Sequence, residues 1–186
     1  MTVKEIIKLV ALMQGRENVL EYLDGQNALA SEELLKIVNA LTGLTNLVIN
    51  ELACTYIPMV KVERVSVDGG RIYYKDLKER PLKIVALYGV NGNSLEYTQN
   101  AEYITVSAAE VEVEYHYAPA NYGLEEVIGY TEMNVPARVI AYGVLSELCI
   151  SEGRFDEAVT WHKRYIDALS DICLPKNAVI RKRRWG

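Results

Sequence analysis

The sequence predicts an α+β protein: a helical bundle of four main helices, an inserted antiparallel β sub-domain and an extended C-terminal arm. Apolar residues recur at helical spacing in residues 1–57 and again in residues 120–174. Residues 58–119 instead show the alternation and turn signals of strands. Residues 175–186 lack an apolar face, so we expect an arm there. A length of 186 residues fits one compact domain that carries a sub-domain.

The N-terminal segment has clear start and stop signals for helices. Thr2 and Glu5 form a capping box, in which each side chain accepts a hydrogen bond from a free backbone N–H group. Gly15 is a typical residue at which such a helix ends. A short helix over residues 17–23 follows. These signals predict two helices within the first 25 residues.

A longer helix begins at Ser31, whose hydroxyl is a good N-cap ahead of two acidic residues. It should run to about Tyr56, because Pro58 prevents its continuation. One face of this helix is apolar except at Thr45, which fills a gap in the stripe. The stripe consists of Leu34, Val38, Leu41, Val48 and Leu52.

The middle of the chain predicts four to six antiparallel strands. Asp68, Gly69 and Gly70 predict a tight turn between the strand at Val60 and the strand that begins at Arg71. Residues 82–88 form another β-rich run, which ends at a turn over residues 91–93. Residues 110–117 alternate strictly. Their apolar side carries Val111, Val113, Tyr115 and Tyr117, and their polar side carries Glu110, Glu112, Glu114 and His116.

The C-terminal half predicts two long helices. We expect helix to resume after Gly123, and Asn134 to cap a segment that has Pro136 in its first turn. A final helix ends at Pro175. Its apolar stripe is expected at Phe155, Ala158, His162, Tyr165, Leu169 and Ile172.

The three cysteines, Cys54, Cys149 and Cys173, are widely spaced within apolar stretches. This pattern predicts buried, reduced thiols in an intracellular protein. The first 25 residues lack the features of a secretory signal. No window approaches about 18 uninterrupted apolar residues, so we expect no membrane partner.

We find no motif that indicates catalysis, a metal site or a cofactor, and we predict that the protein is not an enzyme. The two histidines, His116 and His162, lie far apart and outside any zinc-ligand spacing. His162 is expected to be a core or interface histidine. Glu110, Glu112 and Glu114 are expected to form a solvated sheet face, since no partner for acid–base chemistry is evident.

The charge is unevenly distributed along the chain. The net charge is −5, yet residues 176–186 contain five Lys or Arg residues and no acidic residue. The first 175 residues therefore carry −10. An acidic body followed by a basic arm restricts the partners that the arm can bind.

Three interpretations of the arm are open: a solvated tail, a contact with nucleic-acid phosphates, or a segment that docks on a partner protein. The acidic body gives a poor electrostatic field for nucleic-acid binding. A tryptophan next to a cluster of cations favours docking on a protein, with the indole as an anchor. The docking residues would be Arg181, Lys182, Arg183, Arg184 and Trp185.

The order of elements resembles that of phage head–tail connector, or adaptor, proteins, of the short-tailed-phage gatekeeper type. The resemblance rests on two N-terminal helices, the strand from Val111 to Pro119, a Pro-capped helix, and the Glu-Ala-x-x-Trp-x-x-x-Tyr pattern from Glu157 to Tyr165. It covers residues 1–175 as a pattern.

The resemblance implies a virion structural protein located at the neck, between head and tail, and assembled in the host cytoplasm. About a dozen copies would form a ring under the portal protein and extend the DNA channel. The ring would provide the attachment platform for a tail, nozzle or neck protein. The arm, Arg181 to Trp185, would reach the portal. A negative lumen would let double-stranded DNA pass without binding, and Glu110, Glu112 and Glu114 are the candidate channel-facing residues.

Two other functions fit the same residues. One is another phage neck or tail-completion protein, which differs in its position in the particle. The other is a cellular module that binds a protein or a nucleic acid. DNA binding that depends steeply on salt and requires residues 176–186 would favour the cellular module.

Overall fold

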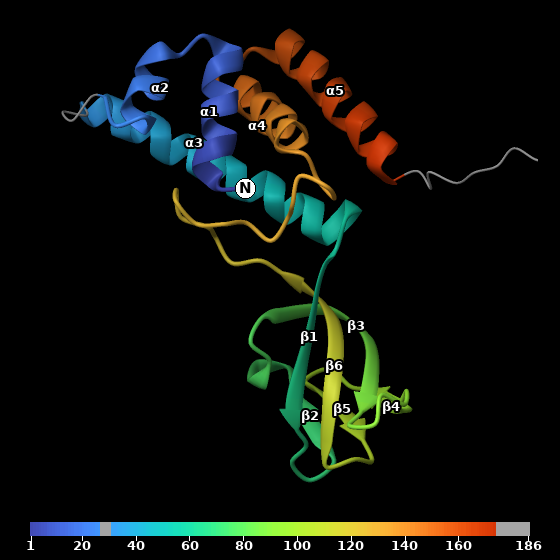
Figure 1. Ribbon diagram of the computed structural model, residues 1–186. Coiled ribbons are helices and arrows are strands. Elements are labelled where there is room, and N and C mark those ends of the chain that lie inside the picture. The colour runs from blue at the N-terminus through green and yellow to red at the C-terminus, as the bar shows by residue number, and fades with distance from the viewer. Residues whose placement is uncertain (27–30, 174–186) are drawn as a thin grey trace, which may run out of the picture.

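A computed structural model describes residues 1–26 and 31–173 of the chain. Within these residues the fold is mixed α+β, with five α-helices and two antiparallel sheets of three strands each. Figure 1 shows the helices gathered at one end and the strands at the other. The helices are α1 (Val3–Gln14), α2 (Glu17–Leu23), α3 (Glu32–Glu51), α4 (Ala137–Ser151) and α5 (Phe155–Cys173). The strands are β1 (Met59–Ser66), β2 (Arg71–Tyr73), β3 (Arg80–Gly89), β4 (Tyr97–Gln99), β5 (Tyr103–Val106) and β6 (Glu110–Ala118).

The predicted helix boundaries in the N-terminal part are confirmed. The Thr2 hydroxyl accepts from the Glu5 N–H at 3.2 Å, and the Glu5 carboxylate accepts from the Thr2 N–H at 2.8 Å. Gly15 ends α1 in the left-handed region, with φ at 64°. Ser31 caps α3 by accepting from the Leu34 N–H at 3.2 Å. These signals act within one helical turn, which is why the sequence alone determines them.

Helices from both ends of the chain share one apolar core. α4 packs against α1, α3 and α5, as Figure 1 also shows. Ile7 of α1, Ile49 of α3 and Ile140 of α4 are fully buried within it. All five residues of the predicted stripe belong to this core, and the buried Thr45 satisfies its hydroxyl by donating to the Leu41 carbonyl at 2.8 Å. The strands therefore lie between two groups of helices in the sequence, although these two groups pack together in space.

The end of α3 widens into a π-helical turn, Leu52–Tyr56, which Figure 1 shows leading into β1. The Ile57 N–H donates to the Leu52 carbonyl at 2.8 Å, and Pro58 follows. The continuous helix Glu32–Tyr56 is long and apolar enough to cross a membrane, the one such helix among the described residues. A core helix passes the same test, and this helix packs against α1 and α4.

The two sheets have the strand orders β1-β6-β3 and β2-β5-β4. The predicted turn at Asp68 forms, because the Arg71 N–H donates to the Asp68 carbonyl at 2.9 Å and Gly69 and Gly70 have positive φ. The strands on either side of it nevertheless enter different sheets: β1 pairs with β6, and β2 pairs with β5. Turn residues determine the local reversal, whereas the apolar faces that meet determine strand partners.

The two sheets share a second apolar core. Val111, Val113 and Tyr115 of β6 point into it and are almost fully buried, as their alternation predicts. Ile72 and Ile104 of the smaller sheet pack against them. This core excludes water from one face of the larger sheet and leaves the opposite face without a covering layer among the described residues.

Residues 119–136, which connect β6 to α4, contain no helix, contrary to our prediction that helix resumes after Gly123. The prediction that Asn134 caps α4 is also wrong. Pro136 occupies the N-cap position, and the Glu132 carboxylate accepts from the Ala137 N–H at 3.1 Å. A carboxylate near a helix N-terminus provides the same acceptor as an Asn cap, so the longer Glu side chain replaces it here.

The predicted stripe of α5 is wrong at two of its six positions. Phe155, the first residue of the helix, is 66% exposed, and His162 is exposed. Trp161 takes the inward position and stacks on Tyr142 of α4, with ring centroids 5.8 Å apart. Positions 161 and 162 both lie between the buried turns at Ala158 and Tyr165, and the larger apolar ring occupies the interface.

Candidate interaction surfaces

The uncovered face of the β1-β6-β3 sheet is the first candidate surface, and we call it the outer face. Its central row consists of the predicted residues Glu110, Glu112, Glu114 and His116, all half-buried. Strand register places Val62 and Val60 of β1 opposite Glu114 and His116. These valines are 55% and 52% exposed. The outer face therefore combines acidic side chains with apolar ones that no described residue covers.

The acidic row is partly compensated within the sheet. Arg64 of β1 donates from Nη2 to Glu112 at 3.2 Å, and its Nε lies 4.0 Å from a Glu110 oxygen. The Tyr88 hydroxyl donates to Glu114 at 3.1 Å, and this hydrogen bond raises the pKa of Tyr88. Three carboxylates thus face one guanidinium and one phenol, and the row keeps a net negative charge.

The sequence pattern found the acidic row but missed the valines. Alternation over residues 110–117 separates the two sides of that strand without reference to any other strand. The side on which Val60 and Val62 lie depends on their register with β6, where their partners His116 and Glu114 are 56 and 52 positions further along the chain. Their signal in the sequence is the pair of valines two positions apart, which alone does not distinguish a core face from an exposed one.

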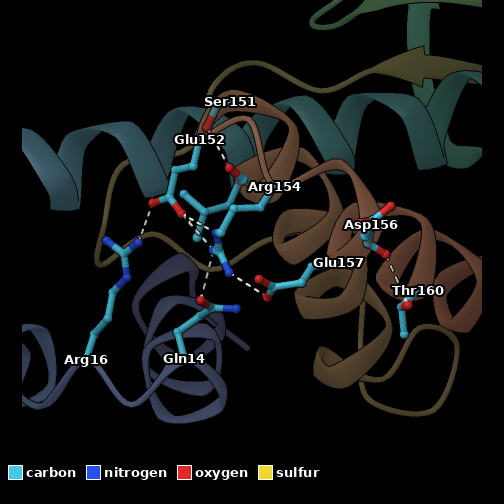
Figure 2. A network of polar contacts seen from close by, with 9 residues as sticks. Gln14, Arg16, Ser151, Glu152, Arg154, Asp156, Glu157 and Thr160 are labelled. Atoms are coloured by element: carbon cyan, nitrogen blue, oxygen red, sulfur yellow. Dashed lines mark hydrogen bonds and ion pairs between the residues drawn. The ribbon is translucent and has the colours of Figure 1, made fainter.

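A network of polar side chains connects the end of α1 to the turn between α4 and α5 (Figure 2). Arg154 donates to Glu152 at 2.6 Å, to Glu157 at 2.6 Å and to Gln14 at 3.0 Å. Arg16 also pairs with Glu152. Burial raises the pKa of Glu152, but the hydrogen bonds from Arg154 and Arg16 outweigh it and leave the pKa below the ordinary value. The network therefore ties the end of α1 to α4 and α5.

The cysteines follow the predicted burial only in part. Cys149 lies buried in α4, and burial raises the pKa of its thiol. Cys54 and Cys173 are exposed, so the prediction of buried thiols is wrong for them. Both lie at helix ends, in the π turn after α3 and at the last described residue of α5, where the described residues leave them exposed.

The arm residues, Arg181, Lys182, Arg183, Arg184 and Trp185, lie outside the described residues. The structure therefore does not place them relative to the outer face. His116 lies on the outer face and His162 on α5. Among residues 1–26 and 31–173, no three His, Cys, Asp or Glu side chains are grouped so that they could hold a metal ion. Compared with models of known protein families and with curated proteins, the chain shows no match to either.

Proposed function

We propose that this chain is a head–tail connector, or adaptor, protein of a phage virion, which forms a ring under the portal. In this proposal the helices form a four-helix bundle that carries the β sub-domain as an insertion. The ring extends the DNA channel, and a tail, nozzle or neck protein attaches to it. The arm at Arg181 to Trp185 docks on the portal.

One observation carries the proposal: α1 and α3 pack against α4 from the other end of the chain, while the strands between them form a separate core at the far end of the molecule. This arrangement, visible in Figure 1, gives one chain two ends that can contact different partners. A protein that joins a head to a tail needs two separate regions, one for each partner.

The charge distribution gives further support. Residues 1–175 carry −10, and the outer face adds a row of carboxylates on one sheet surface. Repeated around a ring, a negative surface repels the phosphates of DNA and lets the duplex slide past. The exposed valines beside the row suit a contact with a neighbouring protein, since apolar side chains at the centre of an interface stabilise association.

The proposal is tested by mixing the purified chain with portal rings and measuring the mass of the product by native mass spectrometry. We expect the chain to add to the portal as one complete ring, and a variant that lacks residues 176–186 to remain unbound. The proposal would be overturned if the chain does not bind the portal at concentrations where the portal ring is intact. Binding to duplex DNA that is lost together with residues 176–186 would instead support a nucleic-acid module.

A further inference from the structure

A pocket of about 700 Å³ lies where the C-terminal end of α5 meets the start of α4 and the π turn after α3. This volume is within the range of roughly 300–1,000 Å³ that is typical of ligand pockets. Its walls are mainly apolar. They include Ile57, Pro58, Pro136, Val139, Ala168 and Ile172. Two charged residues, Arg138 and Asp171, also line it, so the pocket offers one guanidinium and one carboxylate beside an apolar interior.

The position of the pocket indicates its occupant. Cys173, the last described residue of α5, is part of the pocket wall. Trp185 follows it by twelve residues, a length of chain that reaches at most about 40 Å and can also turn back. The apolar wall suits the indole of Trp185, and the Asp171 carboxylate provides a partner for one of the cations that precede Trp185 in the chain.

We propose that the pocket binds the indole of Trp185 from the same chain, and that the basic arm is thereby held on its own α5. A short tether gives the arm a millimolar effective concentration at the pocket, so even a weak contact is occupied. The consequence for assembly rests on the proposed function: the portal has to displace the arm from the pocket, and this lowers the apparent affinity of the free chain for the portal.

The experiment uses tryptophan fluorescence of the full chain. Trp161 is the one other tryptophan, and W161F leaves Trp185 as the single reporter while keeping an aromatic ring against Tyr142. We expect blue-shifted emission and quenching by acrylamide about twofold weaker than for a peptide of residues 174–186, because one face of the indole is covered. Emission and quenching equal to those of the peptide would overturn the proposal.

Two variants test the place of binding. Ile172→Arg introduces a charge into the pocket wall, and Met133→Arg does the same at a wall residue that is 95% exposed, so the second variant should not disturb folding. Both should return the fluorescence of Trp185 to that of the peptide. Val127→Arg is the matched control, since Val127 is 69% exposed on the same connecting segment but does not line the pocket. An unchanged signal in Met133→Arg would contradict docking in this pocket.

Dilution distinguishes the same chain from a second copy. A contact within one chain gives a signal that does not change with protein concentration, whereas loss of the blue shift on dilution would show that the indole binds another copy and would overturn the proposal. These measurements need no portal, so they remain decisive even if the proposed function fails. If both proposals hold, Met133→Arg should bind the portal about twofold or more tightly than the control variant.

Discussion

Asn46 in α3 holds the backbone of Tyr122 from two directions. The Asn46 Nδ2 donates to the Tyr122 carbonyl at 2.9 Å, and the Asn46 Oδ1 accepts from the Tyr122 N–H at 2.7 Å. Asn46 is 7% exposed, so water does not replace these bonds readily. A single side chain thus fixes the segment by which the chain returns from the strands to the helices.

Replacing Asn46 by Ala should lower the free energy of unfolding by about 2–4 kcal/mol, because the backbone N–H and carbonyl of Tyr122 both lose their partner. Asn50→Ala is the matched control on the same helix, since the Asn50 amide bonds only within α3, to the Asn46 carbonyl at 3.1 Å. Urea denaturation of the three proteins measures the difference. Equal midpoints for the two variants would show that the bonds to Tyr122 contribute little.

Replacement by Ala should change the free energy of unfolding in opposite directions at two glycines in helices. A Cβ atom at Gly143 in α4 would lie 2.7 Å from Cγ1 of Val48 in α3, whereas nothing lies within 4 Å of a Cβ at Gly43. Gly143→Ala should therefore destabilise by about 1–3 kcal/mol despite its better helix propensity. Gly43→Ala should stabilise by about 0.5–1 kcal/mol.

Thermal or urea unfolding checks both glycine variants. The double variant Gly143→Ala, Val48→Ala separates the causes, because removing the Val48 methyl groups relieves the close contact. We expect the second substitution to cost less in the Gly143→Ala background than in the original chain. If the changes in free energy of unfolding for Gly143→Ala and Val48→Ala simply add in the double variant, the close contact between the two residues is not the cause.

The sequence predicted what neighbouring residues determine. The caps at Thr2 and Ser31 and the stop at Gly15 act within a turn or two, and all three are confirmed. The sequence did not predict the features that depend on contacts between segments far apart in the chain. No local pattern indicates that β1 pairs with β6 rather than with β2, and the choice between Trp161 and His162 for the inward position depends on Tyr142 in another helix.

The candidate surface follows the same rule. The acidic row lies on a single strand, so its alternation was visible in the sequence, whereas the valines that border it and the guanidinium that compensates it come from β1. The pocket at the end of α5 combines three separate segments of the chain. Sites of that kind become visible only when the segments are placed together.

Glu152 should make the fold sensitive to acid. Its pKa lies below the ordinary value of 4.5, so its pairing with Arg154 and Arg16 stabilises the protein above about pH 4.5 and is lost as the pH falls below it. Glu152→Gln should lower stability at pH 7 by about 0.5–1 kcal/mol, a figure reduced by solvent screening because the side chain is 34% exposed.

The measurement is the free energy of unfolding from pH 7 to pH 3. The difference between Glu152→Gln and the original chain should shrink as the pH falls through this window. Glu125→Gln is the control, since Glu125 pairs with Lys4 at 2.8 Å but is 70% exposed and should contribute less. A difference that stays constant with pH would show that the charge of Glu152 does not stabilise the fold.

The cysteines should fall into two classes in a thiol titration of the native protein. Cys54 and Cys173 are exposed and should react quickly with a thiol reagent, whereas Cys149 is fully buried and burial raises the pKa of its thiol. In the variant that lacks residues 176–186, where the arm cannot cover Cys173 in the pocket wall, native protein should therefore show two fast thiols and denatured protein three. In the Cys54→Ser, Cys173→Ser variant the fast reaction should disappear, and a remaining fast thiol would contradict the burial of Cys149.

Removing the charge of the outer face should change DNA passage while leaving the fold intact. Glu110, Glu112 and Glu114 are half-buried on the sheet surface, so replacing all three by Gln should alter the free energy of unfolding by about 1 kcal/mol or less. In the proposed ring the variant removes repulsion at the channel wall, so DNA should be retained on portal–ring complexes at low salt and released at high salt.

The matched control for the outer face removes three charges elsewhere. Glu17, Glu21 and Glu33 are exposed on α2 and α3, and their replacement by Gln changes the net charge by the same amount. DNA retention is compared for the two triple variants bound to portal. Retention confined to the outer-face variant would support a channel-facing sheet. Equal retention would show that the net charge, rather than this face, repels the duplex, because a long-range field does not depend on which carboxylates supply it.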